Sequence, residues 1–241
     1  LPILYFSPVF QRMQVRGQKI VVLGTGGTIA GTAAAADDNI GYTAAQVGVE
    51  QLLHAVPGLQ AASGGSLVAE QIAQLDSKDM EFSVWGALAQ RCASALADPD
   101  VRGVVITHGT DTLEETAWFL QSVLDAHKPV VLTCAMRPAT ALAPDGPQNL
   151  LDAVTLAAEG RVPGVLVMFA GSIHSAEQVR KVHSYRVDAF ASADGARLVR
   201  EQPVPDVTLS RIGEFVETGL WLETNDQRTV LAPLGYVHEF G

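Results

Sequence analysis

The stretch Val21-Val22-Leu23-Gly24-Thr25-Gly26-Gly27-Thr28-Ile29-Ala30-Gly31 joins an apolar run to a glycine-rich turn. A second stretch, VVITHGTDTLEET at residues 104–116, has a similar plan, because its apolar run ends in a polar turn that opens a helical pattern. Neither apolar run alternates with polar residues, which is typical of strands buried on both faces of a parallel sheet. The two stretches therefore predict buried strands that end in polar turns.

Short apolar runs and longer helical patterns alternate along the chain. The predicted strands are Ile20–Leu23, Leu67–Ile72, Gly103–Thr107, Val130–Cys134 and Val165–Phe169. The predicted helices are Ala45–Ala55, Asp79–Ala97, Leu113–Ala126 and Asn149–Ala158. This alternation predicts an α/β fold with a doubly wound, mostly parallel sheet. Ligands of such sheets bind outside the carboxyl ends of the strands, which places the site after Leu23, Ile72, Thr107 and Cys134.

The composition of the 241-residue chain argues against several classes of function. Sixteen basic and 26 acidic residues give a net charge of −10, so we expect no nucleic-acid partner. The histidines and cysteines form no H-E-x-x-H or Cys-x-x-Cys motif, and we expect no metal site. No apolar run approaches the roughly 18–20 residues of a membrane span, so we expect no membrane partner. Cys134 lies in an apolar run and is predicted to be a small buried hydrophobe.

The residue pattern of the chain changes near residue 201. We predict one catalytic α/β domain over residues 1–200, followed by a linker and a short or truncated C-terminal segment over residues 201–241. The linker is indicated by Gln202–Asp206, and the remaining residues carry one plausible apolar segment around Phe215–Leu222. Before these, the interval Gly24–Thr43 lacks periodicity, and a loop of about twenty residues in a compact domain is usually a lid or disordered.

The glycine-rich turn is consistent with three interpretations. A dinucleotide phosphate cradle would use Gly24 and Gly26, but Thr28-Ile29 occupies the place of the third glycine, and the acid expected about twenty residues later would be Glu50 in a helical pattern. A second interpretation makes Thr28 a nucleophile among exposed backbone amides at the end of the first strand. The third is a tight turn capped by Thr28. The turn alone does not choose among them.

The second stretch places Thr110 and Asp111 at the start of a helix, where free amides and the helix dipole favour an anion. Thr112 and Glu115 have the spacing of a capping box. A helix cap accounts for one of these polar residues, but it does not account for His-Gly-Thr-Asp-Thr as a set.

The two motifs, TGGTIAG (Thr25–Gly31) and THGTDTLEET (Thr107–Thr116), together resemble the signature stretches of the bacterial L-asparaginase family, the asparaginase/glutaminase amidohydrolases. Further segments of the chain are similar to the family in its order, over roughly residues 18–192. These segments are Gly41–Thr43, Val47–Glu50, Asp76–Met80, Ala135–Pro138 and Asp145–Pro147. The resemblance implies a flavodoxin-like N-terminal asparaginase domain.

The resemblance assigns catalytic roles to five residues. Thr28 matches the nucleophile, and Tyr42 matches the tyrosine that closes over the substrate and helps to activate it. Thr110 matches the second catalytic threonine, and Asp111 the carboxylate that pairs with the substrate α-ammonium. Lys181 aligns with the lysine that supports Thr110 and Asp111.

The resemblance also assigns substrate contacts. Ser77 matches the serine that holds the α-carboxylate, and Lys78 stands beside it where many members have glutamine. Thr110 and Asp111 complete the amino-acid pocket. Backbone amides at Thr110 or after Cys134, beginning with Ala135, are placed to stabilise an oxyanion.

The implied activity is hydrolysis of L-asparagine to L-aspartate and ammonia, with L-glutamine as a secondary substrate and no cofactor. The family resemblance implies a homodimer or homotetramer. Asp76, which looks more like the cytoplasmic enzymes, favours the cytoplasm over the periplasm. Three alternatives stay open: an amidase component of tRNA-dependent amidation, a non-catalytic amino-acid-binding protein, and a nucleotide-binding protein.

The family has a second α/β domain of over a hundred residues, which residues 201–241 do not resemble. That domain supplies groups from a neighbouring subunit to the α-ammonium. Because a hydrogen bond to a charged group contributes about 1.5–3 kcal/mol, we expect this chain to bind asparagine roughly ten- to a hundred-fold more weakly than a full-length relative and to have poor or absent activity.

Overall fold

The computed structural model describes residues 19–192, 222–224, 227–232 and 236–240. Its strands are β1 (Lys19–Gly26), β2 (Ser66–Leu75), β3 (Val101–Thr107), β4 (Pro129–Thr133), β5 (Gly164–Phe169), β6 (Ser172–Ser175), β7 (Arg180–Lys181), β8 (Phe190–Ala191), β9 (Leu222–Thr224), β10 (Gln227–Ala232) and β11 (Tyr236–Phe240). Its α-helices are α1 (Val49–Ala55), α2 (Leu59–Ala62), α3 (Phe82–Ala97), α4 (Leu113–Val123) and α5 (Gly146–Glu159), with 3-10 turns η1 (Thr28–Ala30) and η2 (Ser77–Asp79).

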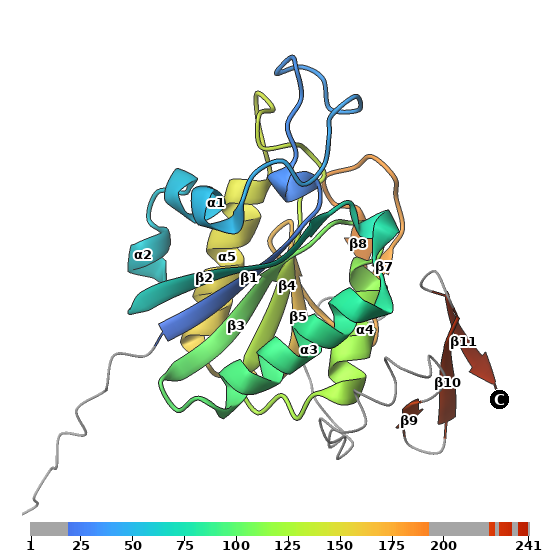
Figure 1. Ribbon diagram of the computed structural model, residues 1–241. Helices are drawn as coiled ribbons and strands as arrows, with labels where there is room; N and C mark the ends of the chain where they lie inside the picture. The colour runs from blue at the N-terminus through green and yellow to red at the C-terminus, as the bar shows by residue number, and fades with distance from the viewer. Residues whose placement is uncertain (1–18, 193–221, 225–226, 233–235, 241) are drawn as a thin grey trace, which may run out of the picture.

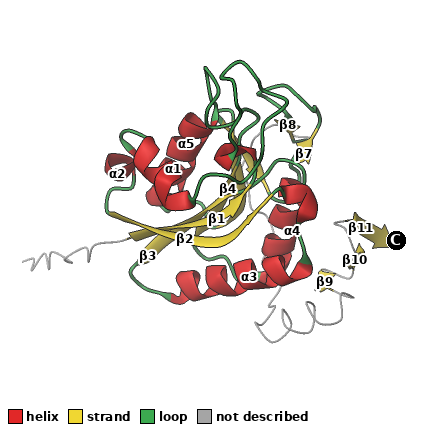
Figure 2. Ribbon diagram, turned by 45° about the horizontal axis from the view of Figure 1, so that its top comes forward, coloured by secondary structure: helices red, strands yellow, loops and turns green. Residues whose placement is uncertain are grey.

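A six-stranded sheet with the order β2-β1-β3-β4-β5-β6 forms the centre of the fold. The pairs from β2 to β5 are parallel, and β6 is antiparallel to β5. Helices α1, α2 and α5 cover one face of the sheet, and α3 and α4 cover the other (Figures 1 and 2). This arrangement confirms the predicted α/β fold with a mostly parallel, doubly wound sheet.

The continuous apolar run in β1 is explained by burial on both faces. Ile20 and Val22 join the hydrophobic cluster under α1, α2 and α5. Val21 and Leu23 point to the opposite face and join the cluster under α3 and α4. Since neighbouring side chains alternate between the two layers, every position in this strand needs an apolar residue.

Several predicted boundaries were wrong for identifiable reasons. Helix α1 begins at Val49 rather than Ala45, because Ala45 has a positive φ of 56°, which is incompatible with an α-helix. Helix α3 begins at Phe82 rather than Asp79, because Asp79 belongs to η2 and Met80 is extended. Helix α4 ends at Val123 rather than Ala126.

Some elements gave no usable signal in the sequence. Helix α2 and strand β6 are too short to show a clear period. Strands β9, β10 and β11 form an antiparallel sheet near the end of the chain. The apolar segment predicted around Phe215–Leu222 lies outside the described residues except for Leu222, which begins β9. The predicted boundary at residues 200 and 201 also lies outside them and stays a prediction.

The predicted capping box at the start of α4 does not form. Thr112 is the N-cap residue of α4, but its side chain does not cap the helix. Its hydroxyl instead donates a 2.9 Å hydrogen bond to the carbonyl oxygen of Ser77. Glu115 lies in the first turn, yet its Oε2 is buried without a hydrogen-bond partner. A tertiary contact has therefore replaced the local cap.

No helix among the described residues is long and apolar enough to cross a membrane.

Two leucine substitutions test the assignment of the core. Leu120 of α4 is 0% exposed and packs in the cluster between the sheet and the two helices α3 and α4. We expect Leu120→Ala to lower the free energy of unfolding by about 2–5 kcal/mol, because it removes buried methyl groups and leaves a cavity. Leu142 is 80% exposed, and Leu142→Ala should change stability by less than about 0.5 kcal/mol. Urea denaturation of both variants measures the difference, and equal costs would contradict the assigned core.

Candidate active site

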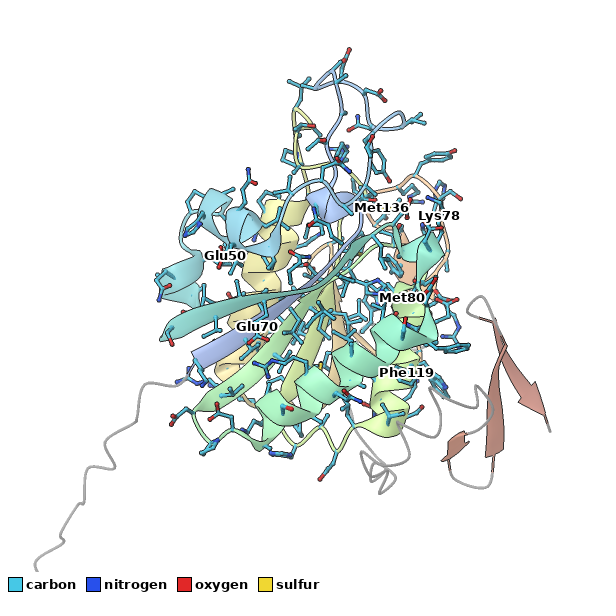
Figure 3. The ribbon with its side chains drawn as sticks, viewed as in Figure 1. Glu50, Glu70, Lys78, Met80, Phe119 and Met136 are labelled. Atoms are coloured by element: carbon cyan, nitrogen blue, oxygen red, sulfur yellow. The ribbon has the colours of Figure 1, made fainter. Side chains whose placement is uncertain are left out.

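The predicted site residues gather where the parallel strands end. Thr28 lies in η1 directly after β1, Ser77 in η2 after β2, Thr110 and Asp111 between β3 and α4, and Ala135 after β4. Figure 3 shows Lys78 and Met136 at this edge of the sheet, while Glu50 lies on α1 and Glu70 on β2 away from it. The fold thus brings together residues that are far apart in the sequence, at the edge where such sheets bind ligands.

Two glycines allow the first and second motifs to touch. A Cβ atom at Gly27 would lie 2.3 Å from the Cα atom of Gly109, and the φ of Gly27 is +78°. A Cβ atom at Gly109 would lie 2.4 Å from the Ser77 hydroxyl oxygen. Since no side chain fits in either place, the backbones around Thr28, Ser77 and Thr110 are in direct contact.

Thr28 is buried in η1, and its hydroxyl oxygen lies 2.7 Å from the hydroxyl oxygen of Tyr42. Tyr42 comes from the loop between η1 and α1, which runs back to η1 through the Thr32–Thr43 bridge. Gln46 and Val47 also donate their backbone N–H groups to the Ala30 carbonyl oxygen. These bonds hold the phenol of Tyr42 over the hydroxyl of Thr28.

The loop that carries Tyr42 projects beyond the sheet edge beside the loop that follows β4 (Figure 1). The Ala33 N–H group donates to the Thr140 hydroxyl at 2.8 Å, and the Leu142 N–H group donates to the Ala36 carbonyl at 2.9 Å. The long loop predicted between Gly24 and Thr43 is therefore shorter than expected, since its first residues belong to β1 and η1. The remainder is braced against a neighbouring loop.

Lys181 joins the second motif from a distant part of the chain. Its ammonium nitrogen lies 2.8 Å from the Thr110 hydroxyl oxygen and 2.6 Å from Asp111 Oδ1. Its backbone N–H group donates to a carboxylate oxygen of Glu114. The side chain of Lys181 is 21% exposed and that of Asp111 is 52% exposed, so this ion pair lies at the boundary of the protein and solvent. Asp111 can still reach a cation outside the protein.

The Ser77 side chain connects the ends of β2 and β3. Its hydroxyl oxygen accepts a 3.1 Å hydrogen bond from the backbone N–H group of Asp111, so its own proton remains available to an outside acceptor. Lys78, next along the chain, forms an ion pair with Asp76 instead of bonding another predicted site residue. The hydrogen bond that the Lys78 ammonium donates to the Asp76 carboxylate raises the pKa of Lys78, which keeps it charged.

Ala135 is fully buried, and the loop that contains it is held by two side chains that the sequence did not identify as functional. The Asp145 carboxylate accepts hydrogen bonds from the backbone N–H groups of Met136 and Arg137, both at 2.9 Å. The Asn149 side-chain amide donates to the Cys134 carbonyl at 3.0 Å. The sequence signal for these residues was Asp145-Gly146-Pro147 at the start of α5. Taken locally, this pattern indicates only the start of a helix.

The dinucleotide interpretation loses its structural basis. Gly24 lies inside β1, paired with Gln71, rather than in a turn. A Cβ atom at Gly24 would lie 2.7 Å from the Val49 side chain, so this glycine serves strand–helix packing. Glu50 is exposed on α1.

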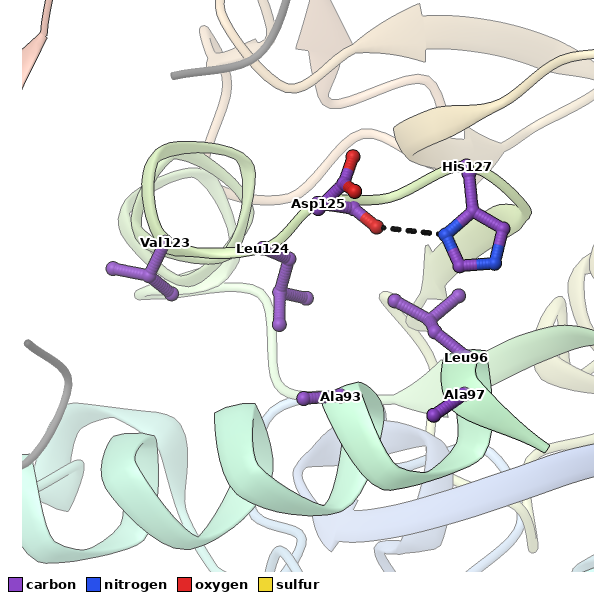
Figure 4. Close-up of a pocket in the computed structure, with 7 residues that line it drawn as sticks. All are labelled: Ala93, Leu96, Ala97, Val123, Leu124, Asp125 and His127. Atoms are coloured by element: carbon purple, nitrogen blue, oxygen red, sulfur yellow. Dashed lines mark hydrogen bonds between the residues drawn. The ribbon is translucent and has the colours of Figure 1, made fainter. Parts of the chain in front are cut away.

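The rest of the described structure offers no competing centre. Cys92 and Cys134 are free and buried, and burial raises the pKa of the Cys92 thiol to about 12. No group of three or more His, Cys, Asp or Glu side chains within the described ranges is arranged to hold a metal ion. An apolar groove lies between the last turns of α3 and α4 (Figure 4), and no predicted site residue lines it. It is lined by Ala93, Leu96, Ala97, Val123, Leu124, Asp125 and His127.

Comparison with known proteins agrees with this fold. Residues 19–207 match the family model described as Asparaginase, N-terminal. Glutaminase-asparaginase from Acinetobacter glutaminasificans is 42% identical over 179 residues, which are 73% of this chain and 54% of that protein. L-asparaginase 2 from Escherichia coli is 41% identical over 177 residues, which are 73% of this chain and 49% of that protein.

A solved structure gives the same result. The crystal structure of a probable cytoplasmic L-asparaginase from Campylobacter jejuni superposes with a TM-score of 0.70 at 41% identity, covering 78% of this chain and 59% of that one. Fold and site thus define a doubly wound α/β domain in which threonine and lysine side chains gather at the carboxyl ends of the parallel strands. The chain belongs to the asparaginase family and matches its N-terminal domain. It spans about half the length of the curated relatives that it matches.

Glu115 gives the site region a testable pH dependence. Burial raises the pKa of its carboxyl group to about 7 from the ordinary 4.5. The folded chain therefore keeps this proton up to about pH 7, whereas the unfolded chain releases it near 4.5, and the stability that the proton contributes is lost as the pH rises between these values. Glu115→Gln cannot titrate, so its stability relative to the wild type should increase from about pH 5 to about pH 8.

Urea denaturation at both pH values measures this change. Glu50→Gln, on the exposed surface of α1, is the matched control and should show no such trend. A constant difference between Glu115→Gln and the wild type would contradict the burial of a neutral carboxyl group.

Proposed function

We propose that this protein is an amidohydrolase that converts L-asparagine and water to L-aspartate and ammonia through an acyl-enzyme on Thr28. The observation that carries the proposal is the 2.7 Å contact between the hydroxyls of Thr28 and Tyr42, on a turn that touches the turn bearing Thr110. A threonine hydroxyl at its ordinary pKa is a weak nucleophile and needs a partner for its proton. Tyr42 is that hydrogen-bonding partner.

The chemistry proceeds in two halves. The Thr28 oxygen attacks the side-chain amide carbon of asparagine while its proton passes through the Tyr42 hydroxyl. The tetrahedral intermediate collapses, the carbon–nitrogen bond breaks, and ammonia leaves with the transferred proton. Water then attacks the resulting ester, with Thr110 and Lys181 guiding its proton, and releases aspartate while Thr28 regains its hydrogen.

Charged groups at the edge suit an amino-acid substrate. Asp111 is half exposed and uses one oxygen for Lys181, which leaves carboxylate capacity for the α-ammonium. The Ser77 hydroxyl proton is available for the α-carboxylate. Lys78 adds a cation beside Ser77, although Asp76 holds it. Backbone amides at Thr110 and Ala135 are the proposed oxyanion donors.

The finer proposals follow the relatives. L-glutamine is the secondary substrate, because several relatives carry the name glutaminase-asparaginase. A cytoplasmic location follows the Campylobacter jejuni protein described as a probable cytoplasmic L-asparaginase. We propose association into a homodimer or homotetramer, since Ile40, Leu142, Val182, Tyr185 and Val187 are large exposed apolar side chains on loops.

Thr28→Ala tests the nucleophile. We expect ammonia release from asparagine to fall by several orders of magnitude while aspartate binding is retained, because the variant lacks the atom that forms the acyl-enzyme. Thr155→Ala, which removes an exposed hydroxyl on α5, is the matched control and should turn over like the wild type. Ammonia release and calorimetric aspartate binding decide the matter. Near-normal turnover of Thr28→Ala would refute the assignment, and binding without turnover in the wild type would favour an amino-acid-binding protein.

Lys181→Met tests the charged cluster. The change removes the ammonium group beside Thr110 and Asp111 without removing the proposed contacts to substrate, so kcat should fall far more than KM rises. The control is Lys128→Met, whose ammonium group bonds the Asp98 carbonyl at 2.7 Å. Steady-state kinetics of both variants separate the outcomes. A change confined to KM would show that Lys181 binds substrate instead.

A further inference from the structure

A chain of buried polar side chains lies directly behind the turn that carries Thr110 and Asp111. Its members are Trp85 of α3, Thr116 of α4 and His108, which follows β3, and none of them is more than 2% exposed. The Trp85 indole is fixed by packing, since it stacks on Phe119 with ring centroids 5.1 Å apart. The proposed mechanism does not use these three side chains. Burying a polar group nevertheless costs folding free energy unless its hydrogen bonds are made.

Two hydrogen bonds connect these three residues, and a third connects His108 to the backbone of the turn. Trp85 Nε1 lies 2.9 Å from Thr116 Oγ1, and Thr116 Oγ1 lies 3.0 Å from His108 Nε2. On its other side, His108 Nδ1 lies 2.8 Å from the Gly109 carbonyl oxygen. The series runs from the interior between α3 and α4 to the backbone of the turn.

Chemistry determines the direction of every bond. A carbonyl oxygen only accepts, so the hydrogen of the neutral imidazole must be on His108 Nδ1. Burial lowers the pKa of His108 to about 4, which keeps the ring neutral and leaves a lone pair on Nε2. Thr116 must then donate its proton to Nε2. Its oxygen accepts the Trp85 N–H group, which is a donor only.

The last bond orients a peptide group of the proposed active site. The described chain has no cis peptide bonds, so the Gly109–Thr110 peptide is trans and planar. When its carbonyl oxygen points at the His108 ring, the Thr110 N–H group must point the opposite way. The other side of Gly109 is closed by Ser77 and Gly27, because a Cβ atom there would meet the Ser77 hydroxyl at 2.4 Å and Gly27 Cα at 3.2 Å. The turn is therefore held from both sides.

We propose that Trp85, Thr116 and His108 form a positioning relay that orients the Gly109–Thr110 peptide, so that the Thr110 N–H group and hydroxyl meet the reacting carbonyl of the substrate. This inference rests on the proposed amidohydrolase function. The three residues touch no substrate. They act through the backbone of Gly109, whose rotation would turn the Thr110 N–H group away from a developing oxyanion.

Thr116→Val is the central variant, because it keeps the side-chain shape and removes the hydroxyl in the middle of the relay. We expect kcat for asparagine to fall roughly 10- to 100-fold with KM within about threefold, since a misplaced donor affects the transition state more than substrate binding. Thr116→Ser, which restores a hydroxyl, should recover kcat to within about threefold of the wild type. Ser122→Ala removes another hydroxyl of α4, one that bonds the Trp118 carbonyl, and should leave kcat unchanged.

A second variant covers the case in which Thr116→Val does not fold. Trp85→Phe keeps an aromatic ring to stack on Phe119 and removes only the N–H donor at the far end of the relay. We expect a smaller loss of kcat, again without a matching rise in KM.

Nuclear magnetic resonance provides a readout that does not depend on turnover. With ¹⁵N-labelled histidine, and His108→Gln to assign the signals, the relay requires a hydrogen on Nδ1 and a bare Nε2 in the wild type. The backbone amide signal of Thr110 should shift in Thr116→Val and return in Thr116→Ser. Signals of residues on α5 should not move.

The outcomes separate the relay from the function on which it rests. If the wild type releases no ammonia from asparagine, the proposed function fails, and the His108 tautomer with the Thr110 amide shift still decides whether the peptide is positioned. An active wild type whose Thr116→Val variant folds and keeps full kcat overturns the relay. A hydrogen on His108 Nε2 instead of Nδ1 overturns it as well.

Discussion

The contact between the backbones of Gly27 and Gly109 is the constraint on which the site depends. The Cα atom of Gly109 occupies the space where a side chain at Gly27 would begin, 2.3 Å from the Cβ position. The turns after β1 and β3 can approach so closely only because both residues lack a side chain. Parallel pairing of these two strands brings the turns to one edge, and the glycines then remove the last barrier between Thr28 and Thr110.

Charge is concentrated where the turns meet, and the geometry explains why it is tolerated. Lys181 reaches Thr110 and Asp111 from β7, with its ammonium group only partly shielded from solvent. A fully buried ion pair would carry a large desolvation penalty, whereas a pair at the boundary of the protein does not. The same partial exposure leaves Asp111 accessible to a small charged ligand. Behind the turn, by contrast, His108 is buried and neutral.

The layers of the fold separate stability from chemistry. Apolar side chains of β1 point alternately into the two hydrophobic clusters and hold the sheet rigid from both faces. The polar residues follow the strand ends, where the backbone leaves the sheet and its amides are free to bind. Asp145 and Asn149, at the start of α5, hold the loop after β4 through backbone bonds. A rigid support of this kind is what precise positioning of a reacting group requires.

The sequence by itself determined the parallel sheet and the two motifs at its edge, because strand burial and turn chemistry depend on residues that are neighbours in the chain. It could not supply the start of α1, where Ala45 takes a positive φ, or the fate of Thr112, whose hydroxyl turns to Ser77. The bond between Lys181 and Thr110 spans 71 residues, and the bond between Thr116 and His108 depends on how α4 packs against β5 and α3. The resemblance assigned Lys181 to the support of Thr110 and Asp111. Tertiary structure decided the geometry of both contacts, since they arise from the packing of whole elements and leave no local pattern in the chain.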